Sequence, residues 1–199
     1  MTGQDFFALP TPRLWLVRHA APLVAPGICY GRLDLAADPQ ATQQAAQALA
    51  QALPPGAIVR HSPLLRCTQL AQALRGLRPD LCSQADTRLQ EMDFGQWEGR
   101  AWNTLPRAEL DAWANDLHAY APGGGEPLAW MLARIQAALD HARQNMPDNA
   151  DVVWISHAGV ARCVHWLLAH PQQTATAAQW TQPAPAPGQW HIFGRQPAP

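Results

Sequence analysis

The chain has 199 residues, of which 48% are hydrophobic, and a formal net charge of -1 at pH 7. Its length and hydrophobic fraction favour one globular domain with a buried core and exclude a disordered protein. The balance of 14 basic against 15 acidic residues argues against nucleic-acid and membrane-surface partners, because proteins that bind them carry a basic excess.

The cysteines and the N-terminus indicate the compartment. The 4 cysteines are widely spaced and form no CxxC pair, which argues against a zinc site or a disulfide framework and fits a reducing environment. Residues 1–12 lack the basic and apolar segments of a secretory signal, so we interpret them as a loose leader to a single domain spanning 1–199. No stretch approaches the ~20 apolar residues that cross a bilayer. We therefore expect a cytoplasmic protein with no membrane partner.

The predicted strands and helices alternate along the chain. Apolar runs predict strands at 13–18, 57–61, 81–87 and 151–155. Helix-forming composition predicts helices at 39–53, 63–75, 126–144 and 159–168, and one or two helices over 103–120. Ser62 is predicted to cap the second helix, with Pro63 in its first position. The segments 178–181 and 189–193 are candidate edge strands. This alternation indicates an α/β fold: a three-layer sandwich with a mostly parallel central sheet flanked by helices.

Two of the predicted strands end in histidine. The first stops at Arg18-His19, and the strand at 151–155 is followed by Ser156-His157. Ligands bind at the carboxyl ends of strands in an open α/β sheet. Histidine can act as a nucleophile, and an adjacent arginine can hold an anion by two parallel hydrogen bonds. These residues therefore predict phosphoryl transfer through a phosphohistidine.

Two further segments supply an anion-binding arginine and a candidate acid. Arg66 lies one turn into the helix predicted after Ser62, where backbone N–H groups and the helix dipole attract anions. The glycine-punctuated loop from 89 to 99 contains Glu91 and Glu98. A carboxylic acid beside a phosphoester can protonate the leaving oxygen and then deprotonate the attacking water. Either glutamate could fill that role on this reasoning alone.

These four segments, in this order, resemble the histidine phosphatase superfamily, whose fold is called phosphoglycerate-mutase-like. The matching residues are Arg18-His19, Ser62-Pro63 with Arg66, the segment 89–99, and Ser156-His157 with Gly159-Val160. The resemblance implies that His19 is the nucleophile and Glu91 the proton donor, and it leaves Glu98 as a loop brace. It also implies that Arg18, Arg66 and His157 form the phosphate pocket.

One expected residue has no counterpart in this chain. The family often places an asparagine that contacts the phosphate after the catalytic histidine, but here the chain reads Ala21-Pro22. Arg32, which follows Tyr30-Gly31, is a candidate substitute. We take Arg32, Tyr30 and Trp97 as candidate substrate contacts.

The predicted activity is that of a phosphomonoesterase acting on a small-molecule phosphate ester. The sequence shows no cluster of carboxylates, histidines or cysteines at metal-ligand spacing, so we predict a metal-independent reaction without a cofactor. Segments 91–98, 113–116 and 122–126 are most similar to the α-ribazole phosphatase branch of cobalamin synthesis. The alternatives are a phosphoglycerate mutase, a non-catalytic binding protein on the same fold, and an unrelated α/β domain.

Overall fold

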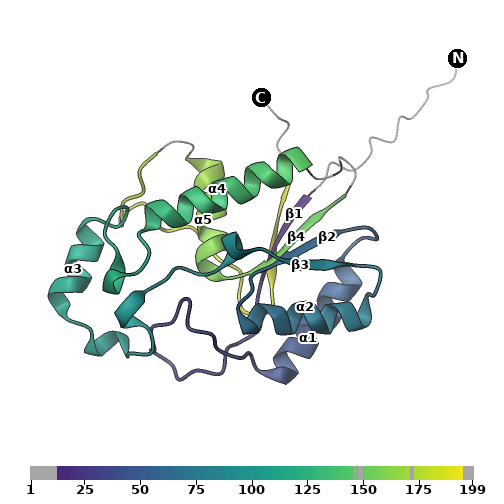
Figure 1. Ribbon diagram of the computed structural model, residues 1–199, viewed down its shortest axis with the longest axis horizontal. Coiled ribbons are helices and arrows are strands. Elements are labelled where there is room, and N and C mark those ends of the chain that lie inside the picture. The colour runs from purple at the N-terminus through teal and green to yellow at the C-terminus, as the bar shows by residue number, and fades with distance from the viewer. Residues whose placement is uncertain (1–12, 146, 148–149, 171–172, 195–199) are drawn as a thin grey trace, which may run out of the picture.

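A five-stranded sheet with helices on both faces forms the part of the chain that the computed structural model describes, residues 13–145, 147, 150–170 and 173–194 (Figure 1). The strands are β1 (Arg13–Arg18), β2 (Ile58–His61), β3 (Ser83–Ala85), β4 (Val152–Ser156) and β5 (Trp190–Gly194). The α-helices are α1 (Pro39–Ala52), α2 (Leu65–Leu77), α3 (Arg107–Asn115), α4 (Leu128–Asn145) and α5 (Ala158–Ala169). Short 3-10 helices span Thr87–Leu89, Gly95–Trp97, Trp102–Thr104 and Pro122–Gly124. The predicted leader, 1–12, lies outside the described residues.

The strand order is β3-β2-β4-β1-β5. The first four strands in this order pair in parallel, and β5 pairs antiparallel with β1 at one edge. Figure 1 shows α1 and α2 on one face of the sheet and α4 and α5 on the other. The predicted three-layer α/β sandwich is therefore confirmed, including an edge strand close to the predicted 189–193.

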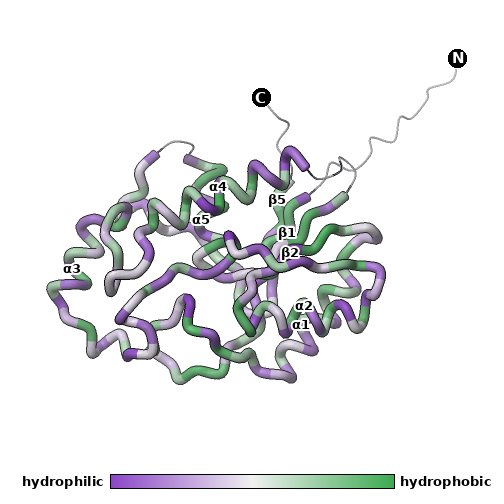
Figure 2. Tube along the Cα trace, viewed as in Figure 1, coloured by the Kyte–Doolittle hydropathy of each residue, from purple (hydrophilic) through white to green (hydrophobic). Residues whose placement is uncertain are grey.

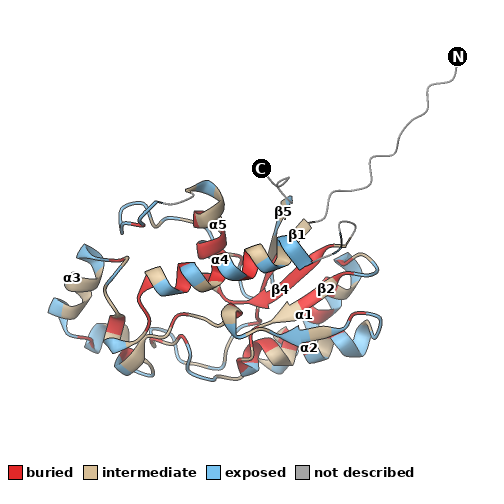
Figure 3. Cartoon of the chain, turned by 45° about the horizontal axis from the view of Figure 1, so that its top comes forward, coloured by how far each residue is buried: buried red, intermediate tan, exposed pale blue. Residues whose placement is uncertain are grey.

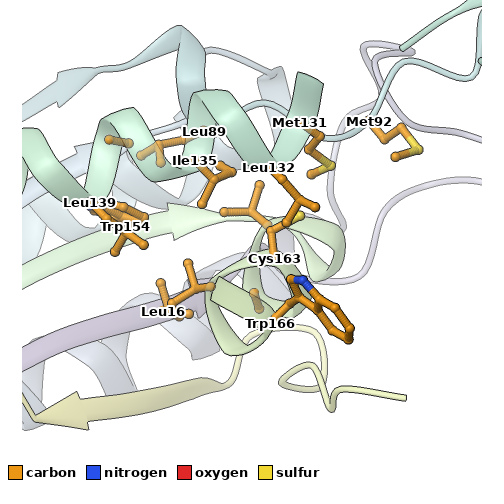
Figure 4. Close-up of a cluster of buried hydrophobic side chains, with 14 of the residues drawn as sticks. Leu16, Leu89, Met92, Met131, Leu132, Ile135, Leu139, Trp154, Cys163 and Trp166 are labelled. Carbon is orange, nitrogen blue, oxygen red and sulfur yellow. The ribbon is translucent and has the colours of Figure 1, made fainter. Parts of the chain in front are cut away.

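Alternating side chains on the central strands bind the two helical layers. On β1, Leu16 packs into the cluster formed by α4 and α5, whereas Trp15 and Val17 pack against α1 and α2. Figure 4 shows Leu16 and Trp154 facing the α4 and α5 side chains. All of β4 is buried because it lies in the middle of the sheet (Figure 3), and the hydropathy-coloured trace shows hydrophobic residues gathered along the strands (Figure 2). Burial of this apolar surface is the main stabilising contribution to such a layered fold.

A separate aromatic cluster lies beside the sheet, where α3 and the surrounding loops meet. Trp97 is buried there with Cys29 and Leu105. Partly buried aromatic residues that pack around them are Phe94, Trp102, Trp113 and Tyr120. This cluster fixes the loop that follows Glu91, since Phe94 and Trp97 belong to it.

Several predicted elements differ from the structure. The helical prediction over 103–120 corresponds to the shorter α3, preceded by the 3-10 turn at Trp102–Thr104, and the predicted strand at 81–87 is reduced to β3. Residues 178–181 form no strand, because Trp180 N–H donates to the Ala177 carbonyl oxygen at 3.3 Å in a local turn. Helix α2 begins at Leu65 rather than Pro63, and its N-cap position is Leu64. The Ser62 side chain is therefore not the helix cap and is used elsewhere. Within the described residues, no helix is long and apolar enough to cross a membrane.

Candidate active site

Three adjacent parallel strands bring the candidate residues to one edge of the sheet. Arg18 pairs with Ser156 where β1 and β4 end, and the His19 N–H donates to the Ser156 carbonyl oxygen at 3.0 Å. On the other side of β4, Ser62 N–H donates to the Ile155 carbonyl oxygen at 2.9 Å. The sheet register thus places the residues that follow β1, β2 and β4 side by side. As a result, the rings of His19 and His157 lie 5.2 Å apart between centroids.

His19 has a geometry that frees one ring nitrogen. Its Nδ1 lies 2.6 Å from the Ala20 carbonyl oxygen, which can only accept a hydrogen bond. We therefore assign the proton to Nδ1, which leaves the Nε2 lone pair available. The side chain is 2% exposed, and burial, assisted by the charges of Arg66 and Arg18, lowers the pKa of His19 to about 3. The imidazole is consequently neutral at neutral pH, as a nitrogen nucleophile must be.

Arg66 donates a hydrogen bond to that unprotonated nitrogen. It is fully buried in the first turn of α2, and its Nε lies 3.3 Å from His19 Nε2. Its Nη1 and Nη2 donate to the carbonyl oxygens of Leu33 and Gly31 at 2.9 and 2.6 Å. The ring of Tyr30 lies 5.6 Å from the guanidinium carbon. The loop at 30–33 therefore holds the arginine beside His19, and Tyr30 contacts this arginine.

His157 is held by residues that flank the start of α2. Its Nε2 lies 2.9 Å from the Ser62 Oγ and 3.6 Å from the Cys67 Sγ. Burial is the main cause that lowers the pKa of His157 well below its usual value, followed by the charge of Arg66. Burial also raises the pKa of the Cys67 thiol, which packs as a neutral group. Ser62 therefore belongs to the site, whereas the sequence predicted only a helix cap at this position.

Arg18 carries an unpaired donor in the same region. Its Nη1 donates to the Pro185 carbonyl oxygen at 3.1 Å. Its Nε is buried and has no hydrogen-bond partner among the described residues. A buried N–H without an acceptor is unfavourable, and an anion is the acceptor that a guanidinium binds most strongly. This donor fits the predicted phosphate-binding role of Arg18.

Glu91 contacts the start of α5, two residues after His157. Its Oε2 accepts a hydrogen bond from the Gly159 N–H at 3.0 Å, in the first turn of α5, and its Oε1 accepts one from Met92 N–H at 3.1 Å. A Cβ atom added at Gly159 would overlap the Glu91 carboxylate. The glycine is therefore needed for this close approach, and the two backbone donors fix the carboxylate beside the second histidine.

Glu98 binds backbone groups and joins two loops. Its Oε1 accepts hydrogen bonds from the N–H groups of Arg32 and Phe94 at 2.8 and 3.0 Å, and its Oε2 accepts one from Leu33 N–H. With both oxygens occupied by backbone donors, Glu98 is suited to bracing the loop that holds Arg66. This geometry agrees with the interpretation of Glu98 as a brace.

The side chain of Arg32 faces acidic groups. It is 40% exposed and lies 3.6 Å from Asp93 and 3.9 Å from Glu126. No hydrogen bond of its guanidinium to the two histidines is present in the described part of the chain. A role as the missing phosphate contact would require the side chain to leave these two carboxylates.

Trp97 is placed away from solvent. It is 1% exposed, and its Nε1 donates to Glu109 Oε2 at 2.7 Å. Its ring packs against those of Trp102 and Trp113 at 6.3 and 5.7 Å. A side chain with so little exposed surface and an occupied polar group packs the core and offers no face to a substrate. Among the partly buried rings of this cluster, those of Trp102 and Trp113 stack at an interplanar angle of 8°.

The donor set of the site does not suit a metal. Within the residues that the structure describes, no group of three or more histidine, cysteine, aspartate or glutamate side chains could hold a metal ion. The clustered groups are instead two arginines, two neutral histidines and backbone N–H donors. Together with the fold, they define a class: an α/β sandwich with a basic, histidine-lined site at the carboxyl ends of its parallel strands.

Comparison with known proteins identifies the family within this class. The family model described as "Histidine phosphatase superfamily (branch 1)" matches residues 14–189, so the chain belongs to the histidine phosphatase superfamily. No curated protein gives a match.

The fold is also found among solved structures. The protein TTHB049 from Thermus thermophilus is 26% identical with a TM-score of 0.67, and the match covers 90% of this chain and 92% of that one. A mycobacterial glucosyl-3-phosphoglycerate phosphatase, Rv2419c, complexed with VO3, is 25% identical with a TM-score of 0.74, covering 91% of this chain and 92% of that one. The family and these neighbours support a phosphatase.

Proposed function

We propose that this protein is a metal-independent phosphomonoesterase that forms a phosphohistidine at His19 Nε2. The observation that carries the proposal is the state of His19: Nδ1 is bound to the Ala20 carbonyl oxygen at 2.6 Å, and Nε2 faces the Arg66 Nε at 3.3 Å. A neutral imidazole with an unprotonated Nε2 beside an anion-binding arginine can attack a phosphoryl group that takes over the hydrogen bond of Arg66 Nε.

The reaction has two steps. In the first, the Nε2 lone pair of His19 attacks phosphorus, the ester P–O bond breaks, and Glu91 gives its proton to the departing alcohol oxygen. In the second, Glu91 takes a proton from water while the water oxygen attacks phosphorus. The P–N bond then breaks, inorganic phosphate leaves, and the lone pair returns to Nε2.

Arg18, Arg66 and His157 are proposed to bind the non-bridging phosphoryl oxygens. The two guanidinium groups supply positive charge, and the imidazole of His157 supplies an N–H donor. Preorganised donors of this kind usually make the largest single contribution to catalysis, because charge that develops in the transition state meets groups already in place. Burial of Arg66 and His157 strengthens their contacts, since these two side chains are shielded from water.

The comparisons favour hydrolysis over a mutase reaction. The mycobacterial neighbour is a phosphatase by name and was studied with VO3, a phosphate-like oxyanion. The substrate in its name is known for that protein only, because a shared fold does not imply a shared substrate. For this chain the proposal is hydrolysis of a small-molecule phosphomonoester.

α-Ribazole 5′-phosphate is the proposed physiological substrate. The proposal rests on the similarity of segments 91–98, 113–116 and 122–126 to the α-ribazole phosphatase branch. It is supported by the stacked Trp102 and Trp113, next to the loop that carries Glu91, because an aromatic base can stack on such rings. Stacking contributes ~0.5–1.5 kcal/mol beyond area burial, which is a preference of up to about tenfold in binding.

A substrate panel tests both the reaction and the substrate. The panel contains α-ribazole 5′-phosphate, mononucleotides, a sugar phosphate, 3-phosphoglycerate and glucosyl-3-phosphoglycerate, and His19→Asn protein prepared in parallel controls for contaminating phosphatases. We expect inorganic phosphate from several esters and the highest kcat/KM for α-ribazole 5′-phosphate. A higher kcat/KM for another ester would contradict the substrate proposal. Interconversion of phosphoglycerates without net hydrolysis would contradict the phosphatase proposal.

A further inference from the structure

Arg134, on α4, uses every hydrogen-bond donor of its side chain. Its Nε and Nη2 donate to the Oε1 and Oε2 of Glu126 at 2.7 and 2.8 Å. Its Nη1 donates to the carbonyl oxygens of Arg88 and Gln90 at 2.6 and 2.7 Å, and Nη2 donates also to the Glu91 carbonyl oxygen at 3.2 Å. A guanidinium group has five N–H donors in a rigid plane. All five are therefore paired, and three of the partners belong to the backbone that ends at Glu91.

Glu126 contacts both Arg134 and the backbone of this loop. Its side chain is 8% exposed and orients Arg134, which is 15% exposed, through a bidentate ion pair. Its own backbone N–H donates to the Asp93 carbonyl oxygen at 2.8 Å. The Glu126–Arg134 pair thus holds the chain on both sides of Glu91. With the backbone held, the Glu91 carboxylate can move only by rotation about its side-chain bonds. Its hydrogen bonds with the N–H groups of Gly159 and Met92 restrict that rotation.

We propose that Arg134, oriented by Glu126, is a positioning residue for the acid–base function of Glu91. This inference rests on the proposed function of Glu91 as proton donor. Arg134 bonds to the backbone of the acid rather than to its carboxylate, so it acts on where Glu91 lies and not on the chemistry directly. Proton transfer depends on placing the acid within hydrogen-bond reach of the leaving oxygen, and a displacement of about 1 Å can cost ~10²-fold.

A purely structural role makes a different prediction from a positioning role. Lost packing or stability would lower turnover equally on every substrate. A displaced acid lowers it most where the leaving group needs a proton, because a phenolate of low pKa departs without one. The ratio of kcat/KM for an alkyl phosphate to that for p-nitrophenyl phosphate therefore separates the two roles.

Arg78 provides a matched control at the end of α2, which packs on the other face of the sheet from α4. Its guanidinium donates to the carbonyl oxygens of Ala50, Leu53 and Pro54 and pairs with Asp80 at 2.7 Å. It therefore binds three carbonyls and one carboxylate, as Arg134 does, but it holds the ends of α1 and α2. Arg78→Lys removes the same kind of contacts without touching the loop of Glu91.

The experiment measures both substrates with Arg134→Lys, Arg78→Lys, Glu91→Gln and the double variant Arg134→Lys/Glu91→Gln. Lysine keeps the charge, but its ammonium cannot span three carbonyls and a carboxylate. We expect Arg134→Lys to lower kcat/KM for the alkyl phosphate by about tenfold or more and to affect p-nitrophenyl phosphate far less. Adding it to Glu91→Gln should cost little more, because a missing acid cannot be misplaced. Arg78→Lys should leave the substrate ratio unchanged.

An equal loss on both substrates, or additive losses in the double variant, would overturn the inference. Thermal unfolding of each variant shows whether the assay measures folded protein. If Arg134→Lys does not fold, Glu126→Gln is the deciding variant. Glutamine keeps the shape of the glutamate side chain but weakens its bonds to the Arg134 guanidinium, so this variant must show the same change in substrate ratio. Failure of the proposed function would look different: wild-type protein would hydrolyse no monoester, or Glu91→Gln would lose nothing on the alkyl phosphate.

Discussion

Acid is expected to destabilise this protein through its buried histidines, and replacing His19 should relieve part of that effect. The pKa of His19 is about 3 in the folded protein and 6.5 in the unfolded chain. Between these two values the unfolded state binds a proton that the folded state does not. The stability contributed by neutral burial is therefore fully present above pH 6.5 and is lost as the pH falls toward 3. Protonation of the unfolded state drives this loss.

The size of the effect follows from the two pKa values. At about pH 4.5 an unfolded histidine is almost fully protonated, whereas His19 in the folded protein is almost fully neutral. Lowering the pH from about 7.5 to about 4.5 should therefore cost about 2.5 kcal/mol through His19 alone. His157, whose pKa is also lowered, adds a loss in the same direction.

Urea unfolding at both pH values measures this contribution. His19→Asn keeps an N–H in the place of Nδ1 for the Ala20 carbonyl but cannot titrate. The free energy of unfolding of this variant should fall by about 2.5 kcal/mol less than that of the wild type over the same range. Carboxylates with a lowered pKa, such as Asp151, contribute to both proteins and cancel. His141→Asn is the control, because His141 is exposed on α4.

Equal losses in wild type and His19→Asn would refute the reasoning. They would mean that the pKa of His19 is the same in the folded protein as in the unfolded chain, so that burial does not hold the imidazole neutral. A smaller loss in the wild type than in His19→Asn would mean that the folded protein holds His19 protonated at neutral pH, without a lone pair on Nε2.

The other predictions concern the acid and the metal. Turnover should survive exhaustive treatment with EDTA, and activity that is lost and then restored by magnesium or zinc would place the protein in another class of phosphatase. Glu91→Gln should reduce hydrolysis of an alkyl phosphate by ~10²–10⁴-fold but affect phosphoenzyme formation from p-nitrophenyl phosphate far less. Glu98→Gln should give a smaller loss that does not depend on the leaving group. The reverse pattern would make Glu98 the acid. Gly159→Ala should fold, because it displaces only the flexible end of Glu91, and should reproduce the Glu91→Gln pattern in steady-state assays; unchanged alkyl phosphate turnover would contradict the placement of Glu91.

Local patterns in the sequence were enough to predict the elements that carry the site. The apolar run before Arg18 and the one before Ser156 are short, strongly hydrophobic and sharply ended, so both strands were predicted within a residue. The pairing of these two strands could not be predicted in the same way. The pairing of β1 with β4 joins segments more than a hundred residues apart, and no local propensity encodes it. The rule that ligands bind at the carboxyl ends of parallel strands brought His19 and His157 to one site in the prediction, and the family motifs then assigned their roles.

Tertiary contacts explain what local reasoning missed. Ser62 precedes a proline, which suits a helix cap, but the neighbouring strand places His157 against its hydroxyl group. Trp97 lies in a loop sequence typical of a binding site, yet the surrounding aromatic residues bury it. Arg134 is an ordinary residue of an amphipathic helix in the sequence. Only the folded backbone of the loop before Glu91 shows the contacts on which its proposed positioning role rests.

The most direct test of the account is the chemical nature of the enzyme-bound phosphate. Protein quenched during turnover of a radiolabelled ester should carry a phosphoryl group that is labile to acid and stable to alkali, as a phosphoramidate is. Peptide mass spectrometry should locate it on His19, and His19→Asn should show neither label nor turnover. An acid-stable label, a label on another residue, or full turnover by His19→Asn would contradict the phosphohistidine mechanism.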